Sequence, residues 1–81
     1  GNPGLSQEEV VQRLARALWA VEIHQQDASK TWKEIAREVA WPYHFKLLQD
    51  ARHRLVRAQE SNDPILEEAE RLKEKLQRKS G

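Results

Sequence analysis

Residues 40–46 read AWPYHFK and interrupt a chain that is otherwise rich in charged residues and in apolar residues at helical spacing. Aromatic side chains alternate here around Pro42, at positions 41, 43 and 45. A residue that precedes proline is disfavoured in the α region, whereas proline suits the first position of a helix because that position needs no N–H donor. The stretch therefore predicts that one helix ends near Trp41 and that another begins at Pro42.

The first helix is predicted over residues 7–25. Ser6 stands where an N-cap accepts a hydrogen bond from a first-turn N–H, and Glu9 follows it at the spacing of a capping box. Apolar side chains then recur at intervals of three and four residues, which places them on one helical face. These residues are Val11, Leu14, Leu18 and Val21.

The second helix is predicted over residues 30–40. Thr31 and Glu34 have the spacing of another capping box, while Asp27 is an alternative cap that would start the helix one turn earlier. One face of this segment is apolar, as expected for a helix that packs against the first. It consists of Trp32, Ile35, Ala36 and Val39.

Two more helices are predicted after the proline, over residues 42–60 and 64–79. Asp63 and Pro64 supply an N-cap and a first position for the fourth helix. Its apolar stripe is narrow, like the seam of a coiled coil, so this helix is also a candidate for self-association. The stripe of the third helix consists of Leu47, Leu48, Ala51, Leu55 and Ala58, and that of the fourth of Ile65, Ala69, Leu72 and Leu76.

These signals predict an all-α protein, an antiparallel bundle of three to four helices joined by short loops. We expect a single helical domain over residues 5–80, and we expect residues 1–4, GNPG, to be the remnant of a cleaved tag. The sequence contains no methionine, and its local signals agree with one another as they do in idealised proteins. This combination favours an engineered or designed origin.

Composition narrows the class of protein further. The chain has 81 residues, of which 38% are hydrophobic and 33% charged, and its net charge is +1. It contains no cysteine, which excludes a disulfide framework and a thiolate nucleophile. No apolar run reaches the roughly 18 residues of a membrane span, and no secretory signal pattern is present. We expect a soluble protein, cytoplasmic or recombinant, with no targeting signal and no membrane partner.

The residue inventory does not predict catalysis. His24, His44 and His53 lack the i,i+4 spacing with which two histidines bind zinc on one helix. The glycines lie near the two ends of the sequence, so no glycine-rich phosphate loop is present. We therefore expect no enzyme, no catalytic residue, no metal site, no cofactor and no small-molecule substrate.

The aromatic residues Trp41, Tyr43 and Phe45 have two interpretations. They seal the corner between the second and third helices, or they form an exposed patch that binds a protein, since tryptophan, tyrosine and arginine dominate such contacts. The leading hypothesis is a non-enzymatic helical bundle that serves as a structural scaffold or presents a helix to a protein partner.

The predicted third helix suggests an alternative function, because it is basic and follows a tight turn. A helix-turn-helix protein inserts such a helix into the major groove. Asp50 is its only acidic residue before Gln59. Its cationic residues are Lys46, Arg52, Arg54 and Arg57.

The segment ALWAVEIHQQDASKTWKEIAREV, residues 17–39, resembles the first two helices of Myb/SANT-type domains, and the resemblance extends over residues 6–58. Trp32, Ile35 and Ala36 match the W-x-x-I/V-A motif of that family, whereas Leu5 stands where its first tryptophan would be. The resemblance implies a DNA-binding domain and a nucleic-acid partner. The residues implied for base contact are Lys46, Gln49, Asp50 and His53, and those for phosphate contact are Arg54 and Arg57.

Overall fold

The structure is a computed structural model that describes residue 4 and residues 6–80. The described chain forms four helices and no strand: α1 (Gln7–Gln26), α2 (Trp32–Glu38), α3 (Phe45–Glu60) and α4 (Ile65–Ser80). Short connectors join them, so the predicted all-α bundle with short loops is confirmed. The predicted cap Ser6 also forms, while Leu5 and the segment 1–3 lie outside the described residues.

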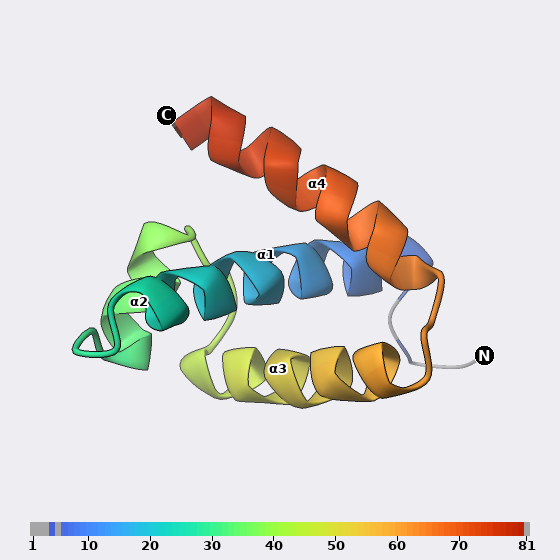
Figure 1. Cartoon of the computed structure of the whole chain (residues 1–81), viewed down its shortest axis with the longest axis horizontal. Coiled ribbons are helices and arrows are strands. Elements are labelled where there is room, and N and C mark those ends of the chain that lie inside the picture. The colour runs from blue at the N-terminus through green and yellow to red at the C-terminus, as the bar shows by residue number, and fades with distance from the viewer. Residues whose placement is uncertain (1–3, 5, 81) are drawn as a thin grey trace.

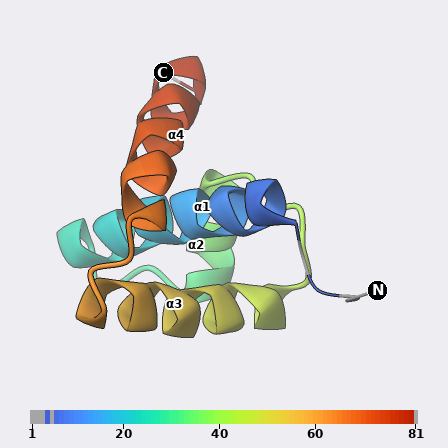
Figure 2. The same cartoon turned by 90° about the vertical axis from the view of Figure 1, so that its right-hand side faces the viewer.

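Helix α1 is the central element of the bundle, because α2, α3 and α4 each pack against it. The helices cross more steeply than an antiparallel bundle implies. Helices α1 and α3 run in opposite directions in Figure 1 but in the same direction in Figure 2, so their axes cross. Helix α4 leans across α1 and makes few contacts with α3. One face of α3 is therefore not covered by any other helix.

The core is built from a few large side chains and many alanines. Leu14, Ile35, Val39 and Leu48 are the largest fully buried residues. Alanine contributes little volume, so helices that meet through it approach one another closely. The buried alanines are Ala15, Ala17, Ala20, Ala51, Ala58 and Ala69. Most other large apolar side chains of α1 and α4 are only half-buried around this core.

The end of α2 shows why the chain turns before the proline. The N–H of Trp41 donates to the carbonyl of Ala36 at 2.8 Å, and the N–H of Ala40 donates to the carbonyl of Arg37 at 3.1 Å. This pair of bonds is a Schellman motif, in which one residue takes a left-handed conformation. Ala40 is that residue, with φ of 53°. The guanidinium of Arg16, on α1, donates to the carbonyls of Val39 and Ala40 at 2.6 and 3.2 Å.

Helix α3 also ends in a Schellman motif, but the residue in the left-handed conformation is better suited to that conformation. The N–H of Asp63 donates to the carbonyl of Ala58 at 2.9 Å, and that of Asn62 to the carbonyl of Gln59 at 3.3 Å. Asn62 occupies the left-handed position, also with φ of 53°. Asparagine tolerates this conformation more readily than alanine does, so the two helix stops differ in their backbone strain.

The prediction that α3 begins at Pro42 was wrong. The helix begins at Phe45, and His44 is its N-cap, with the imidazole Nδ1 accepting a hydrogen bond from the N–H of Lys46 at 3.2 Å. Residues 41–44 form a non-helical connector instead. The indole N–H of Trp41 donates across this connector to the carbonyl of His44 at 3.3 Å, which closes it into a compact joint.

The predicted N-caps of α1, α2 and α4 are present, although Asp27 and Glu9 have other roles. Thr31 and Glu34 form a complete capping box at α2, and Asp63 accepts from the N–H of Ile65 at 3.0 Å at α4. Asp27 instead accepts from the N–H of Ser29 at 3.1 Å and orders the loop before α2. At α1 the hydroxyl of Ser6 accepts from the N–H of Glu9 at 3.2 Å, but the carboxylate of Glu9 points to another partner, described below.

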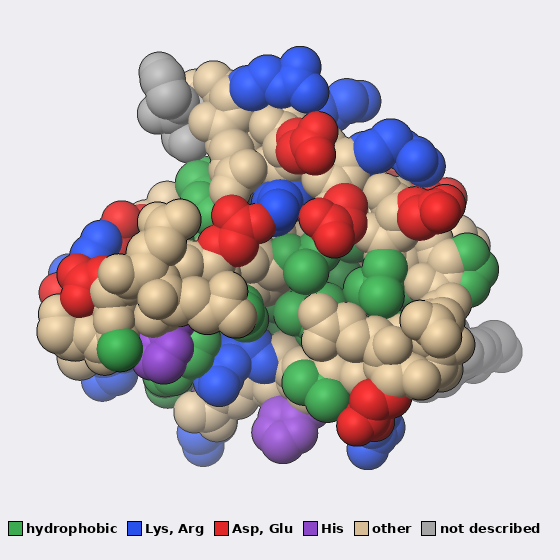
Figure 3. Space-filling model, in the orientation of Figure 1, with side chains coloured by type: hydrophobic (Ala, Val, Ile, Leu, Met, Phe, Trp, Pro, Cys, Tyr) green, Lys and Arg blue, Asp and Glu red, His purple; other side chains and the backbone are tan. Residues whose placement is uncertain are grey.

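Helix α4 is fastened to α1 by a polar contact as well as by apolar packing. The ammonium of Lys73 donates to the carboxylate of Glu22, and the side-chain amide of Gln77 donates to the same carboxylate at 3.1 Å. The pKa of Glu22 is lowered, chiefly by the Lys73 hydrogen bond. Figure 3 shows acidic and basic side chains intermingled over α4, in agreement with the pairing of Arg78 and Glu74 at 3.9 Å.

Candidate functional site

The uncovered face of α3 carries the residues that the sequence associates with nucleic-acid contact. All of them are exposed, and they extend along most of the helix. Helices α1 and α2 hold α3 from its opposite face through Leu48, Ala51 and Leu55, which are buried. The exposed residues are Lys46, Gln49, Asp50, His53, Arg54 and Arg57.

The cations of α3 lack acidic partners in the described chain, whereas four of the ten lysines and arginines outside α3 have one. Arg13, Lys30, Lys73 and Arg78 each lie within 4.0 Å of a carboxylate. Within residues 6–80, no lysine or arginine of α3 forms such a pair, and the acidic residues of that helix do not neutralise them by direct contact. An exposed helix with unpaired cations attracts anions at short range, although the net charge of the chain is only +1.

The aromatic joint is tied into the fold by specific contacts. The hydroxyl of Tyr43 donates to the carboxylate of Glu9, and the guanidinium of Arg13 lies over its ring, 4.3 Å from the ring centroid. The pKa of Tyr43 is raised, first by burial and then by the Glu9 carboxylate. The carboxylate of Glu9 therefore accepts from Tyr43 at the aromatic joint, instead of from the N–H of Ser6 as the predicted capping box requires.

Trp41 and Phe45 lie beside Tyr43 and are half-buried. The rings of Trp41 and Tyr43 meet edge to face, with centroids 5.1 Å apart. Aromatic pairs prefer this arrangement. With Lys33 and Arg37, the three aromatics line a shallow cavity of about 220 Å³. The side chains that were candidates for a protein-binding patch therefore contribute to the corner of the fold and keep part of their surface accessible.

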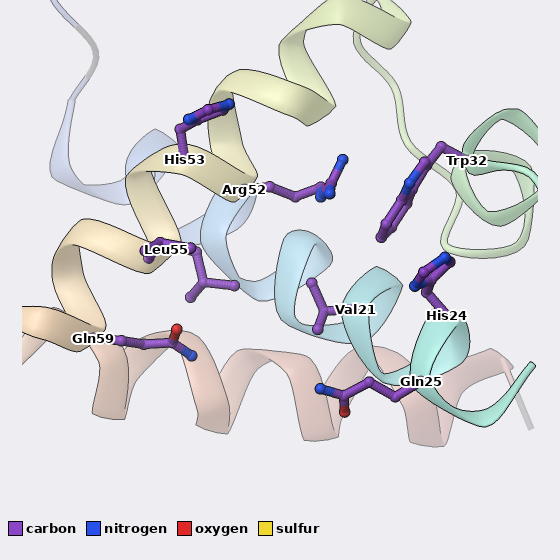
Figure 4. A pocket seen from close by; sticks show the side chains of 9 residues that line it. Val21, His24, Gln25, Trp32, Arg52, His53, Leu55 and Gln59 are labelled. Carbon is purple, nitrogen blue, oxygen red and sulfur yellow. The ribbon is translucent and has the colours of Figure 1, made fainter. Parts of the chain in front are cut away.

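A second cavity lies on a different part of the surface, between the end of α1, the start of α2 and the middle of α3. Its volume is about 450 Å³, within the range of small-ligand pockets. Its walls combine aliphatic side chains with basic and amide side chains (Figure 4). The lining residues are Val21, His24, Gln25, Trp32, Arg52, His53, Leu55, Val56 and Gln59.

Trp32 occupies one wall of this cavity between two basic side chains. The imidazole of His24 stacks on it with ring centroids 4.4 Å apart and an interplanar angle of 19°, and the guanidinium carbon of Arg52 lies 3.7 Å from the ring centroid. Figure 4 shows the indole between the two. Partial burial lowers the pKa of Arg52, since it disfavours the charged form.

The three histidines are distributed over separate parts of the fold. His24 stacks on Trp32, His44 caps α3, and His53 is exposed on α3. Among the residues that the structure describes, no group of three histidine, cysteine, aspartate or glutamate side chains is arranged to hold a metal ion.

Sequence reasoning located the basic helix and the aromatic joint but missed the Trp32 cavity. The apolar spacing predicts only that Trp32 lies on the apolar face of the second helix, and the charge pattern groups Arg52 with the cations of the third. Their contact depends on how α2 and α3 cross, and the sequence carries no local signal for that angle. His24 and Trp32 are eight residues apart across a loop, and this spacing does not predict that their rings stack.

Comparisons with known protein families, with characterised proteins and with solved structures find no match to this chain. Among the described helices, none is long and apolar enough to cross a membrane.

Proposed function

We propose that this chain is a non-enzymatic helical binding module that presents the open face of α3 to double-stranded nucleic acid. The observation that carries the proposal is the row of exposed cations on α3, unpaired within the described chain and left uncovered by α4. The resemblance of the segment before α3 to Myb/SANT-type domains supports the same interpretation. In this proposal Arg54 and Arg57 contact phosphates, and Lys46, Gln49, Asp50 and His53 face base edges.

The dimensions of α3 suit this role. A helix of 16 residues is about 24 Å long, and the major groove is wide enough to admit a helix. Arginine and lysine side chains that replace condensed counterions provide the affinity, so binding should weaken steeply as salt is added. The small net charge of the chain restricts this attraction to the α3 face, and we expect micromolar affinity at low salt and much weaker binding at physiological salt.

Fluorescence anisotropy of a labelled random-sequence duplex, titrated at several salt concentrations, tests the proposal. Replacing Arg54 and Arg57 together by glutamine should lower the slope of log affinity against log salt by about two, since two phosphate contacts are lost. The double replacement of Lys33 and Arg37 by glutamine is the matched control. It removes the same charge from the exposed surface of α2 and should leave most of the affinity in place.

Equal loss of affinity in both double variants would reduce the effect to general charge attraction and contradict a specific face on α3. Absence of binding at low salt would remove the nucleic-acid proposal entirely. The second candidate function, a structural scaffold or a module that presents a helix to a protein, would then take its place. The accessible edges of Trp41 and Phe45 beside Lys33 and Arg37 favour that candidate over an inert bundle.

A further inference from the structure

We propose that the cavity between α1, α2 and α3 binds a small carboxylate with an apolar body, and that the guanidinium of Arg52 recognises the carboxylate. This site adjoins the α3 face proposed above to bind nucleic acid and shares His53 with it, but Arg52 is not one of the exposed residues of that face. It involves the side of α3 that meets α1 and α2, and it includes Trp32 and Val21, which contribute nothing to the exposed cation row.

The guanidinium of Arg52 is the group that would bind the carboxylate. Its guanidinium is partly buried, and in the described part of the chain no carboxylate or carbonyl accepts a hydrogen bond from it. The nitrogen atoms of Arg52 are not among the buried unsatisfied atoms of the described chain, so they stay accessible to an incoming anion while the guanidinium lies over Trp32. A bound anion would supply the missing partner.

The geometry of the stack supports the same conclusion. An arginine that stacks on an aromatic face keeps its N–H groups at the edge of the guanidinium plane, where they match the two oxygens of a carboxylate. Trp32 contacts the guanidinium from one side and itself stacks on His24, so the position of Arg52 is restricted before a ligand arrives (Figure 4).

The remaining walls select the rest of the ligand. Val21, Leu55 and Val56 supply an aliphatic surface, while Gln59 and His53 supply polar groups at the rim. Among the described residues that line the cavity none is acidic, so its charge is complementary to an anion. A volume of about 450 Å³ accepts a small molecule or one side chain, which distinguishes this site from the extended face of α3.

Titration of the protein with benzoate, followed by two-dimensional ¹H–¹⁵N NMR, tests the proposal. The signals of the Arg52 side-chain N–H and the Trp32 indole N–H should shift and saturate. Benzamide has the same shape without the charge and should bind at least about tenfold more weakly, a difference of about 1.4 kcal/mol. N-acetyl-leucine tests the other source of the same chemistry, the carboxyl terminus of a peptide; tighter binding than benzoate would assign the site to peptides, and weaker binding to free acids.

Two arginine variants complete the design. Arg52→Gln should weaken benzoate binding by about tenfold or more, whereas Arg54→Gln, on the exposed face, should leave it within about twofold. For duplex binding we expect the reverse ranking, which separates this site from the proposed nucleic-acid face.

The proposal is overturned if benzamide binds as tightly as benzoate, if inorganic phosphate produces the same shifts at the same concentrations, or if both variants lose equal affinity. The benzoate and benzamide comparison on the unaltered chain remains decisive even if Arg52→Gln fails to fold.

Discussion

Ala40 and Asn62 occupy equivalent positions in two helix stops, yet only one of them suits the position. Each has φ of 53° and each completes a Schellman motif. A side chain beyond Cβ gives asparagine local hydrogen bonds that partly offset the steric cost of this region, whereas alanine has none. The surrounding hydrogen bonds, including those from Arg16, impose the conformation on Ala40.

Replacing Ala40 by glycine should therefore stabilise the protein by about 0.5–1 kcal/mol, because glycine adopts positive φ without steric cost. The gain is reduced by the greater freedom that glycine gives the unfolded chain. Urea unfolding followed by circular dichroism measures the change. Asn62→Gly is the matched control and should change the free energy of unfolding by only a few tenths of a kcal/mol. A loss of stability in Ala40→Gly would show that the left-handed turn is not strained.

At the scale of single elements, the starts of α1, α2 and α4 were predictable from local sequence, whereas the start of α3 was not. Thr31 with Glu34, and Asp63 with Ile65, interact within four residues of sequence, so a local pattern contains the whole interaction. The start of α3 was missed because Tyr43 contacts α1, and that contact extends the connector beyond Pro42. The preference of proline for a first helical position was therefore overridden by tertiary structure.

The attachment of α4 to α1 leads to a prediction about pH. Lys73 and Gln77 lower the pKa of Glu22, so their contribution to stability is present above the ordinary pKa of 4.5 and is lost as the pH falls through the lowered value. Glu22→Gln should cost about 0.5–1 kcal/mol at neutral pH, a modest value because this carboxylate is partly exposed and screened by water.

Hydrogen exchange of the α4 amides, measured at neutral pH and below pH 4.5, checks this expectation. At neutral pH the Glu22→Gln variant should exchange faster than the parent protein across α4, and the difference should fade as the pH falls. Glu74→Gln is the control, since Glu74 and its partner Arg78 are both exposed and both lie on α4. A difference that persists in acid would mean that Glu22 acts through packing and not through charge.

For the whole molecule, stability depends on α1, the helix on which every other helix packs. The apolar spacing of residues 7–25 predicted this helix and the burial of Val11 and Leu14, whereas Leu18 and Val21 of the same predicted stripe are only half-buried. Neither the crossing of the helices nor the cavity at Trp32 was predictable, because both arise from the packing of side chains far apart in the sequence. The open face of α3 also depends on this packing, because α4 packs on α1 and leaves that face uncovered.

Leu14→Ala should lower the free energy of unfolding by about 3 kcal/mol, since Leu14 is 1% exposed and its truncation leaves a cavity beside neighbours that are already small. Unfolding followed by tryptophan fluorescence and by circular dichroism should shift together, as expected for one cooperative unit. Leu47→Ala, at a half-buried position on α3, is the comparison and should cost less. Two separate transitions would show that α1 does not couple the other helices.

The central position of α1 also has a consequence for the order of folding. Residues 27–31, 39–44 and 61–64 are the only chain between successive described helices, so each neighbouring pair closes a short loop. The contact between α1 and α4 closes across the whole of α2 and α3, at a higher cost in chain entropy. We expect the first three helices to associate first and α4 to dock last, so that the surface of α1 beneath α4 stays in contact with water until the final step.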